Sequence, residues 1–504
     1  MTRLVSTISA LRQLLHHQRD VGFVPTMGAL HPGHVSLIQR AQQENSWVVV
    51  SIFVNPLQFG LGEDFDRYPR SFDQDLQLCE KLGVDVVFAP TPAEMGVDQR
   101  HQTQVVPDPS LTQGLCALQR PGHFTGVATI VTKLLNIVRP HRLYLGEKDA
   151  QQLAVIQKLV SDLCIPVEVI PCSTVRENNG LAYSSRNQYL TPAQKQTASH
   201  IYRGLDRAQK AFKQGERQRQ ALLAQVQLEL ADYPELELEY LDLVDAETLT
   251  PLERLEDGTV GLVAVSAKLG TTRLIDNVRL VCRRPIIAID GPAGAGKSTV
   301  TSRVAKELGL LHLDTGAMYR SISLAVLQAG IDPEDASAVA EIAAQTPIEL
   351  LPVHPLQVRI HGQNVTNAIR SSAVTKLVPT IAAQPAVRQI LEKTQRHLGK
   401  KGGIVIEGRD IGTRIFPDAE LKIFLTASVA ERALRRQQEL RARGEEVSLE
   451  ELTQSIQERD HRDSTREVSP LRKADNAILI NSDGISVDGV VAEIIRLYRQ
   501  ICHD

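Results

Sequence analysis

The sequence predicts an α/β protein that contains two doubly wound units, each built on a parallel sheet. Two observations lead to this fold class. Short apolar runs alternate with helical patterns between about residues 20 and 190, and the same alternation starts again at residue 285. Each region also opens with an apolar run that leads into a glycine-containing loop and then into a helical pattern. Such alternation indicates strand–helix–strand units whose ligands bind at the carboxyl ends of the strands.

The first region divides by its hydrophobic pattern into strands at 21–25, 47–54, 84–89, 142–146 and 167–170, with helices at 33–44, 71–82, 125–138 and 149–161. Residues 191–282 differ, because a charged, Gln-rich helical stretch to about 231 precedes short strands such as 260–265. The sequence therefore predicts an α/β domain at 1–190, a smaller lid-like subdomain at 191–282 and a second α/β domain at 283–504.

The composition is that of a globular protein, with 42% hydrophobic and 23% charged residues. A net charge of -3 provides no general basic field for nucleic acid, so anionic ligands must be held by local arginines, lysines and backbone N–H groups. The sequence has no apolar run of membrane-spanning length and no apolar leader at its start. We expect a cytoplasmic protein that binds neither nucleic acid nor membranes.

The loop that opens the second region reads Gly291-Pro-Ala-Gly-Ala-Gly-Lys297-Ser298 and matches the G-x-x-x-x-G-K-[ST] pattern between a strand and a helix. Backbone N–H groups of such a loop surround phosphate oxygens. The pattern predicts an ATP site in which Lys297 bridges the β- and γ-phosphates and Ser298 holds Mg²⁺. The alternative is a glycine-rich turn at a helix start. The residues predicted to bind ATP here are Gly291, Gly294, Gly296, Ser298 and Thr299.

Four further motifs follow in order: Asp314-Thr-Gly-Ala-Met-Tyr319-Arg320, His361-Gly-Gln-Asn, Glu407-Gly-Arg409-Asp410-Ile-Gly-Thr413 and Glu458-Arg459-Asp460-His-Arg-Asp463-Ser-Thr-Arg466. Over about 285–500 the chain resembles the cytidylate kinases, which are P-loop nucleoside monophosphate kinases. The resemblance implies that the acceptor is CMP or dCMP and that Lys297, Arg409 and Asp410 are catalytic. It also implies that the acceptor's phosphate, sugar and base are held by Arg320, Arg388, Arg409, Asp410, Arg459, Asp463 and Arg466, with Arg388 and Asp410 facing the cytosine.

Two features of this half leave alternatives open. The basic run at 431–443 resembles a mobile lid over ATP, and the alternative is a solvated basic face of a helix. Pro379 stands where the family usually has a serine, so a hydroxyl contact to the base is either missing or supplied by Thr380. A kinase for another acceptor, such as UMP, is the alternative reading of this half.

The loop that opens the first region reads Pro25-Thr-Met27-Gly28-Ala-Leu-His31-Pro-Gly33-His34. Two histidines beside a helix N-terminus can stabilise the charge that develops on phosphates during nucleotidyl transfer. The glycines allow the backbone to approach the nucleotide. The alternatives are a metal site, for which no third ligand lies nearby in sequence, and histidines with a structural role only.

Five more motifs accompany this loop: Phe53-Val-Asn55-Pro-Leu-Gln58-Phe59, Arg120-Pro-Gly-His123-Phe124, Gly146-Glu-Lys148-Asp149-Ala-Gln-Gln152, Arg176-Glu-Asn-Asn-Gly180-Leu-Ala-Tyr183-Ser184-Ser185-Arg186-Asn187 and Leu274-Ile-Asp276-Asn277. Over about 1–280 the chain closely resembles the pantoate–β-alanine ligases, whose nucleotidyltransferase-like Rossmann unit carries a small C-terminal lid. These enzymes join pantoate to β-alanine through a pantoyl adenylate, and their product feeds coenzyme A synthesis.

The resemblance implies that His34 is the general acid and that His31 and Lys148 stabilise phosphate charge, while Gln58 and Gln152 hold pantoate. The residues implied to bind ATP are Met27, Gly28, Gly33, Gly146, Glu147, Asp149, Val175, Tyr183, Ser184, Ser185 and Arg186. It also implies a homodimer formed through this half. The alternatives are another adenylate-forming enzyme, including a tRNA-charging one, and a degenerate docking module. The charge argues against the former, and the presence of every chemical residue argues against the latter.

Overall fold

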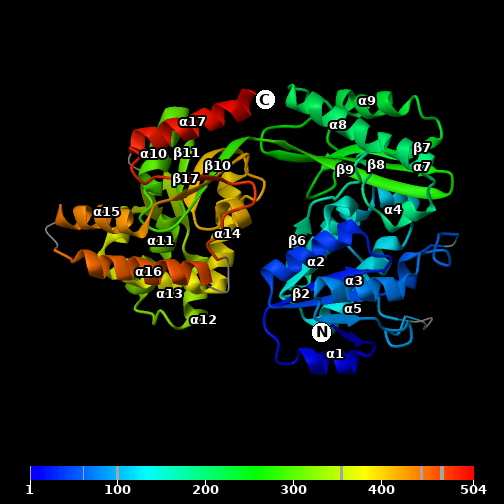
Figure 1. Ribbon diagram of the computed structural model, residues 1–504, viewed down its shortest axis with the longest axis horizontal. Coiled ribbons are helices and arrows are strands. Elements are labelled where there is room, and N and C mark those ends of the chain that lie inside the picture. The colour runs from blue at the N-terminus through cyan, green and yellow to red at the C-terminus, as the bar shows by residue number, and fades with distance from the viewer. Residues whose placement is uncertain are drawn as a thin grey trace. The chain divides into compact units, whose positions relative to one another are not determined.

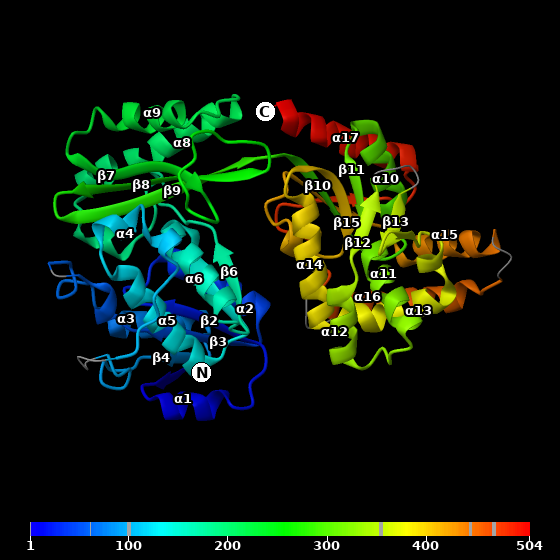
Figure 2. The ribbon, with the colours of Figure 1, turned by 180° about the vertical axis from the view of Figure 1, so that it is seen from behind.

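The computed structural model describes residues 2–60, 62–97, 102–351, 356–442, 446–465 and 470–503. The chain forms two compact units, Met1–Cys282 and Arg283–Asp504, shown in Figures 1 and 2. Only Arg283 separates the last strand of the first unit from the first strand of the second. None of the helices in the described ranges is long and apolar enough to cross a membrane.

The first unit contains a six-stranded parallel sheet with the strand order β1-β4-β3-β2-β5-β6. Its strands are β1 (Arg3–Val5), β2 (Val21–Thr26), β3 (Trp47–Ile52), β4 (Val86–Phe88), β5 (Arg142–Gly146) and β6 (Glu168–Cys172). The helices that accompany them are α1 (Ile8–Leu15), α2 (Pro32–Glu44), α3 (Phe72–Leu82), α4 (Cys116–Gln119), α5 (His123–Val138) and α6 (Ala150–Asp162). The predicted parallel sheet is confirmed, and β1 is an additional edge strand that the sequence pattern did not predict.

Helices cover both faces of this sheet because its strands are apolar on both sides. On β3, Val48 and Val50 pack in the cluster that contains the apolar residues of α2 and α3, whereas Val49 packs in the cluster of α1 and α5. A strand buried on both faces reads as a continuous apolar run, as 47–50 does. Because β2 and β5 are parallel neighbours, the loops that follow them lie at the same edge of the sheet.

Residues 191–282 form three helices and a three-stranded antiparallel sheet. The helices are α7 (Pro192–Ala198), α8 (His200–Lys213) and α9 (Arg219–Leu230), and the strands are β7 (Leu236–Asp245), β8 (Thr259–Leu269) and β9 (Thr272–Cys282). The prediction of short strands was wrong, since these strands have 10 or 11 residues. Gly270, with a φ of 60°, makes the tight turn that lets β8 and β9 pair along their whole length.

The second unit contains a five-stranded parallel sheet with the order β11-β15-β10-β16-β17. Its strands are β10 (Arg284–Asp290), β11 (Leu311–Asp314), β15 (Gly402–Gly408), β16 (Leu421–Thr426) and β17 (Ile478–Asn481). A small antiparallel sheet is formed by β12 (Ile348–Leu351), β13 (Gln357–Ile360) and β14 (Gln363–Asn364). The helices are α10 (Lys297–Leu308), α11 (Thr315–Ala329), α12 (Ala336–Gln345), α13 (Ser372–Ala383), α14 (Pro385–Gly399), α15 (Val429–Arg441), α16 (Leu449–Thr465) and α17 (Val487–His503).

The central strand β10 is also buried on both faces. Ile287 and Ile289 pack in the cluster of α10 and α17, whereas Ile286 and Ala288 pack in the cluster of α11, α13 and α14. The helices α15 and α16 lie side by side in both views (Figures 1 and 2). The sheet thus places the glycine-rich loop after β10 between two layers of helices, which confirms the second doubly wound unit.

Candidate active sites

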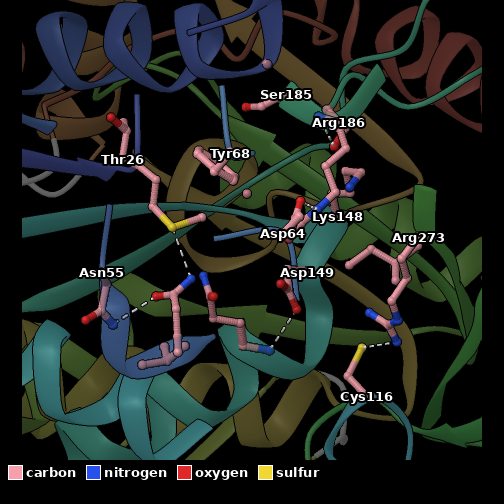
Figure 3. Close-up of a pocket in the computed structure, with 18 of the residues that line it drawn as sticks. Thr26, Asn55, Asp64, Tyr68, Cys116, Lys148, Asp149, Ser185, Arg186 and Arg273 are labelled. Atoms are coloured by element: carbon pink, nitrogen blue, oxygen red, sulfur yellow. Dashed lines mark hydrogen bonds and ion pairs between the residues drawn. The ribbon is translucent and has the colours of Figure 1, made fainter. Parts of the chain in front are cut away.

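The first unit has a cavity of about 670 Å³ at the carboxyl ends of β2 and β5, part of which is shown in Figure 3. The β8–β9 hairpin also contributes to its wall, through residues such as Arg273 and Ile275. The predicted residues that line it are Met27, His31, Gly33, His34, Gln58, Gly146, Lys148, Asp149, Gln152, Val175, Tyr183, Ser184, Ser185 and Arg186. Gly28 and Glu147 belong to the same loops but do not line the cavity. One space therefore collects residues from motifs that are far apart in the chain.

The histidine loop is held by hydrogen bonds to its backbone. Asp75 is buried on α3 and accepts hydrogen bonds from the N–H groups of Ala29 and Leu30, both at 2.8 Å. Gly28 has a φ of 83°, and a Cβ there would meet the Asp75 carboxylate at 3.0 Å. His31 caps α2 by accepting a hydrogen bond from the Gly33 N–H, which leaves the loop little freedom.

Both histidines of the loop are electrically neutral at neutral pH. Burial, with the nearby charge of Lys148, lowers the pKa of His31 to about 4. Burial, followed by the influence of His31 and Lys148, lowers the pKa of His34 to about 3. Their ring centroids lie 4.0 Å apart, and His34 Nδ1 is buried with no hydrogen-bond partner among the described residues. The pair can offer imidazole N–H groups or lone pairs to a ligand in the cavity.

The two glutamines predicted for the first unit lie on different elements. Gln58 Oε1 accepts a hydrogen bond from Asn55 at 3.1 Å, and its Nε2 lies 3.2 Å from the sulfur of Met27. Gln152 is in the first turn of α6, where its backbone N–H is capped by Asp149 at 3.3 Å. Both side chains line the cavity, so its floor offers two amides that can each donate and accept hydrogen bonds.

The glycine-rich loop of the second unit has the conformation that its motif predicts. Gly294 and Gly296 have φ values of 80° and 85°, and a Cβ on Gly291 would meet the Leu425 carbonyl at 1.9 Å. Lys297 Nζ lies inside the loop and donates to the carbonyl oxygens of Gly291 and Pro292 at 2.7 and 2.8 Å. Burial lowers the pKa of Lys297 well below its usual range, an effect that phosphate anions would reverse.

The structure pairs the predicted acceptor-binding arginines of the second unit with carboxylates. Arg388 is buried and donates to Asp410, Arg409 donates to Asp463 at 2.9 Å, and Arg320 donates to Asp314 at 2.8 Å. Arg459 lies on α16 one turn before Asp463, and Arg466 lies outside the described residues. The two residues predicted to face cytosine are therefore in direct contact, although they are 22 positions apart.

The comparisons with known proteins agree with this division. A family model described as pantoate-beta-alanine ligase matches residues 3–279, and one described as cytidylate kinase matches residues 287–500. A protein of Nostoc sp. named bifunctional pantoate ligase/cytidylate kinase is 53% identical over 99% of both chains, and one of the same name from Synechocystis sp. is 54% identical over 99% of both. The chain belongs to the bifunctional pantoate ligase/cytidylate kinase family.

The fold of the ligase unit also matches solved structures. A crystal structure of pantothenate synthetase from Thermus thermophilus is 46% identical and gives a TM-score of 0.52, covering 55% of this chain and 98% of that one. A second structure of that enzyme gives a TM-score of 0.53 at the same identity, with 99% of its chain covered. Because the match covers nearly the whole solved chain but only about half of this one, it corresponds to the ligase unit alone.

Sequence reasoning missed the acidic partners, Asp64 and Glu63, of two arginines that line the ligase cavity. Arg186 forms a bidentate ion pair with Asp64, with two hydrogen bonds of 2.8 Å. Arg120 forms a bidentate ion pair with Glu63, with hydrogen bonds of 2.7 and 2.5 Å. Hydrogen bonds and charge from Arg186 keep the pKa of Asp64 low, although burial acts to raise it. No spacing rule links these partners, because the members of each pair are 57 or 122 positions apart.

In the kinase unit, sequence reasoning assigned no individual role to Glu407, which stands in a motif, or to Arg432, which belongs to the basic run expected to form a lid. Glu407 accepts a hydrogen bond from Ser298 Oγ at 2.8 Å and lies 3.2 Å from His312 Nε2. Arg432, in the basic run, is buried and donates to the Ala293 carbonyl of the glycine-rich loop at 3.0 Å. At least one arginine of that run therefore contacts the glycine-rich loop, so the run is not a uniformly solvated face.

Pro379 lies inside α13 and is exposed, whereas Thr380 is half-buried. The side chain of Arg388 instead contacts the far end of this helix, because it donates to the Ala382 carbonyl at 3.3 Å. The Arg388–Asp410 pair is thus anchored to α13 through the backbone carbonyl of Ala382, and this contact does not involve the side chain at position 379.

The histidines of the ligase cavity lead to a prediction about pH and stability. His31, His34 and His123 have pKa values of about 4, 3 and 4, each lowered chiefly by burial, whereas an unfolded histidine titrates near 6.5. Between these values the unfolded chain binds more protons than the folded one. The free energy of unfolding is therefore expected to fall as the pH drops from 6.5 towards 4, by up to about 1.4 kcal/mol per pH unit for each histidine.

Urea unfolding at pH 7 and pH 5 would measure this effect, since Trp47 is the only tryptophan of the chain and reports on the ligase unit. Replacing His31 and His34 by glutamine should reduce the dependence to the part contributed by His123, whereas His16→Gln, at an exposed position of the same unit, should leave it unchanged. Equal stability at the two pH values would contradict the prediction.

Proposed function

We propose that the ligase unit uses ATP to condense pantoate with β-alanine, and that the kinase unit transfers the γ-phosphoryl group of ATP to CMP or dCMP. One observation carries the first activity: a single cavity contains both histidines of the loop, Lys148 and the two glutamines. The second rests on Lys297 inside the glycine-rich loop, together with the buried Arg388–Asp410 pair.

In the first step of the ligase reaction, a carboxylate oxygen of pantoate attacks the α-phosphorus of ATP and the bond to pyrophosphate breaks. Negative charge grows on the phosphate oxygens, and the Lys148 ammonium and the N–H groups of His31 and His34, all of which line the cavity, would stabilise it. The amides of Gln58 and Gln152 match the hydroxyl and carboxylate groups of pantoate. The implied ATP contacts of the loops at 27–33, 146–149 and 175–186 remain part of this proposal.

In the second step, the neutral amine of β-alanine attacks the carbonyl carbon of pantoyl adenylate. The C–O bond to AMP breaks, and the amine loses a proton as the amide forms. The same groups that stabilised the α-phosphate in the first step, the Lys148 ammonium and the two imidazole N–H groups, can stabilise the leaving AMP. Because one cavity holds the α-phosphate in both steps, the adenylate does not need to leave it.

The kinase unit acts by positioning and by neutralising charge. Lys297 and the backbone N–H groups of the glycine-rich loop hold the β- and γ-phosphates of ATP. The monophosphate acceptor is held by Arg320, Arg409, Arg459, Asp463 and Arg466. Arg388 and Asp410 read the donor and acceptor groups of cytosine.

We also propose that Mg²⁺ binds beside Ser298. The hydroxyl oxygen of Ser298 lies 2.8 Å from a carboxylate oxygen of Glu407, and oxygen ligands of this kind suit Mg²⁺, which usually keeps several waters and binds phosphates. When bound, Mg²⁺ would neutralise charge between the β- and γ-phosphates. Among the described residues no group of three or more His, Cys, Asp or Glu side chains could hold a metal by itself, so phosphate oxygens must complete this site.

Product analysis tests both activities. The protein given ATP, pantoate and β-alanine should form AMP, pyrophosphate and pantothenate, and given ATP with CMP or dCMP it should form ADP and the diphosphate. Formation of ADP with UMP at the same efficiency would favour a broader pyrimidine kinase.

The cytoplasmic location, and the homodimer expected from the resemblance, also remain proposals. Sedimentation of the purified chain tests the dimer.

Changing Asp410 to Asn should weaken the preference for cytosine. The carboxylate accepts a hydrogen bond from Arg388 and, in the proposed complex, one from the cytosine amino group. Leaving such buried groups unpaired costs about 1–3 kcal/mol, so kcat/KM for CMP should fall by about tenfold to a hundredfold, with a smaller fall for UMP. Asp418→Asn, an exposed residue of the same unit, is the matched control, and an unchanged ratio of CMP to UMP activity would remove Asp410 from the base site.

A further inference from the structure

The Leu274–Asn277 motif of the ligase unit lies on β9 and has no role in the reaction as described above. Its residues alternate between the two faces of the antiparallel sheet. Arg273 and Ile275 line the cavity, whereas Leu274 and Val278 belong to the apolar core formed with α8 and α9. Asn277 therefore lies on the cavity side of β9, and its neighbour Asp276 lies on the opposite side.

The Asn277 amide holds the loop that carries Lys148. Its Nδ2 donates to the backbone carbonyl oxygens of Glu147 and Lys148, both at 2.9 Å, and the side chain is buried. Lys148 has no side-chain hydrogen bond among the described residues, so the hydrogen bonds from Asn277 fix the backbone from which its side chain extends. An amide carries two N–H groups on one nitrogen and can satisfy both carbonyls, which a hydroxyl or a carboxylate cannot do.

Asp276 holds the second nucleotide loop from the other face of the strand. Its carboxylate accepts two hydrogen bonds from Arg176 at 2.6 and 3.0 Å, and the guanidinium group lies 3.7 Å from the ring of Tyr202. Arg176 directly follows Val175, whose carbonyl accepts a hydrogen bond from the Tyr183 N–H at 3.0 Å. The base of the 175–183 loop is thus fixed to the same two-residue segment that fixes Lys148.

We infer that Asn277 is a positioning residue for adenylation: it orients Lys148 towards the α-phosphate, and Asp276–Asn277 sets both nucleotide loops from the antiparallel sheet. The inference rests on the proposed ligase activity. It assigns the β9 strand a function in ATP binding, in addition to its place in the core. In the proposed complex pantoate is held by the side chains of Gln58 and Gln152, to neither of which Asn277 is hydrogen-bonded, so the role concerns ATP and not pantoate.

The test compares Asn277→Ala and Asn277→Asp with a control on the same strand. Arg279→Ala removes a side chain that also contacts the loop, through Glu147 Oε1 at 3.4 Å, but it leaves both carbonyl hydrogen bonds in place. Pantoate-dependent exchange of pyrophosphate into ATP measures adenylation alone. In both Asn277 variants the KM for ATP should rise about tenfold or more and the exchange rate should fall, since two buried hydrogen bonds are lost. The KM for pantoate should stay within about twofold of the wild type, because the cost falls on ATP binding.

The Arg279→Ala control should remain close to the wild type in every parameter. CMP phosphorylation by the same chain should be unchanged in all variants, which verifies the amount of folded protein. A fall in kcat with an unchanged KM for ATP would indicate fewer active molecules and would overturn the positioning role.

Unfolding of the ligase unit in both Asn277 variants, detected by Trp47 fluorescence, would assign Asn277 a purely structural role and equally overturn the inference. Asn277→Asp keeps the shape of the side chain, so it remains informative if the alanine variant alone fails to fold. Absence of exchange in the wild type would instead refute the proposed ligase activity.

Discussion

Lys297→Ala is expected to lower phosphorylation of CMP by roughly a hundredfold to a thousandfold, while pantothenate formation stays close to that of the wild type. The lysine is buried in the glycine-rich loop, where its ammonium group donates to two backbone carbonyls. Burial lowers the pKa of Lys297 in spite of the nearby carboxylates of Glu407 and Asp290, and the phosphates of bound ATP would add the negative charge that favours its ammonium form. Alanine removes the cation, and no described side chain of the loop replaces it.

Lys306→Ala is the matched control, because Lys306 lies on the same helix, α10, but is exposed in its last turn. Both rates should be measured on one preparation, so that each activity serves as the folding control for the other. Loss of both activities in a variant that remains folded would refute two independent sites. A nearly unchanged kinase rate would remove Lys297 from phosphate binding.

The sequence predicted correctly those features of the fold whose residues are close together in the chain. The strand–loop–helix context of Gly291–Ser298 is contained in one short continuous segment, and the structure reproduces it. The parallel sheets followed from apolar runs that are buried on both faces. The edge strand β1 was missed because it has only three residues, two of them exposed.

The contacts that complete the two sites were not predictable in the same way. Ser298 and Glu407 are 109 positions apart, and Asn277 and Glu147 are 130 positions apart, so their meeting depends on the whole fold. The long β8–β9 hairpin, in contrast, has a local signal in its Leu269-Gly270-Thr271-Thr272 turn between alternating apolar residues. A search for two-residue turns would have corrected the short strands expected there.

His34→Ala is expected to reduce pantoate-dependent pyrophosphate exchange by about a hundredfold to a thousandfold, the effect of removing one donor to a charged transition state. CMP phosphorylation should not change. Because burial lowers the pKa of His34 to about 3, the free enzyme holds this imidazole neutral throughout the physiological range. A neutral ring supports catalysis by donating an N–H hydrogen bond to phosphate, and it has no extra proton to transfer as an imidazolium acid.

The two chemical roles of His34 can be separated by a second substitution. Glutamine also offers an N–H donor, so His34→Gln should retain more exchange activity than His34→Ala if hydrogen bonding is what matters. Titration of His34 should then make no contribution to the exchange rate between about pH 6 and pH 8. The pH dependence of the wild type over this range should therefore be the same as that of the His34 variants. His17→Ala, at an exposed position of the same unit, is the control. Two results together would contradict this role: a glutamine variant as inactive as the alanine variant, and a wild-type exchange rate that falls as an acidic group loses its proton near neutral pH. Proton transfer from an imidazolium would then be the better explanation. In that case the bound nucleotide would have to raise the pKa of His34 by several units.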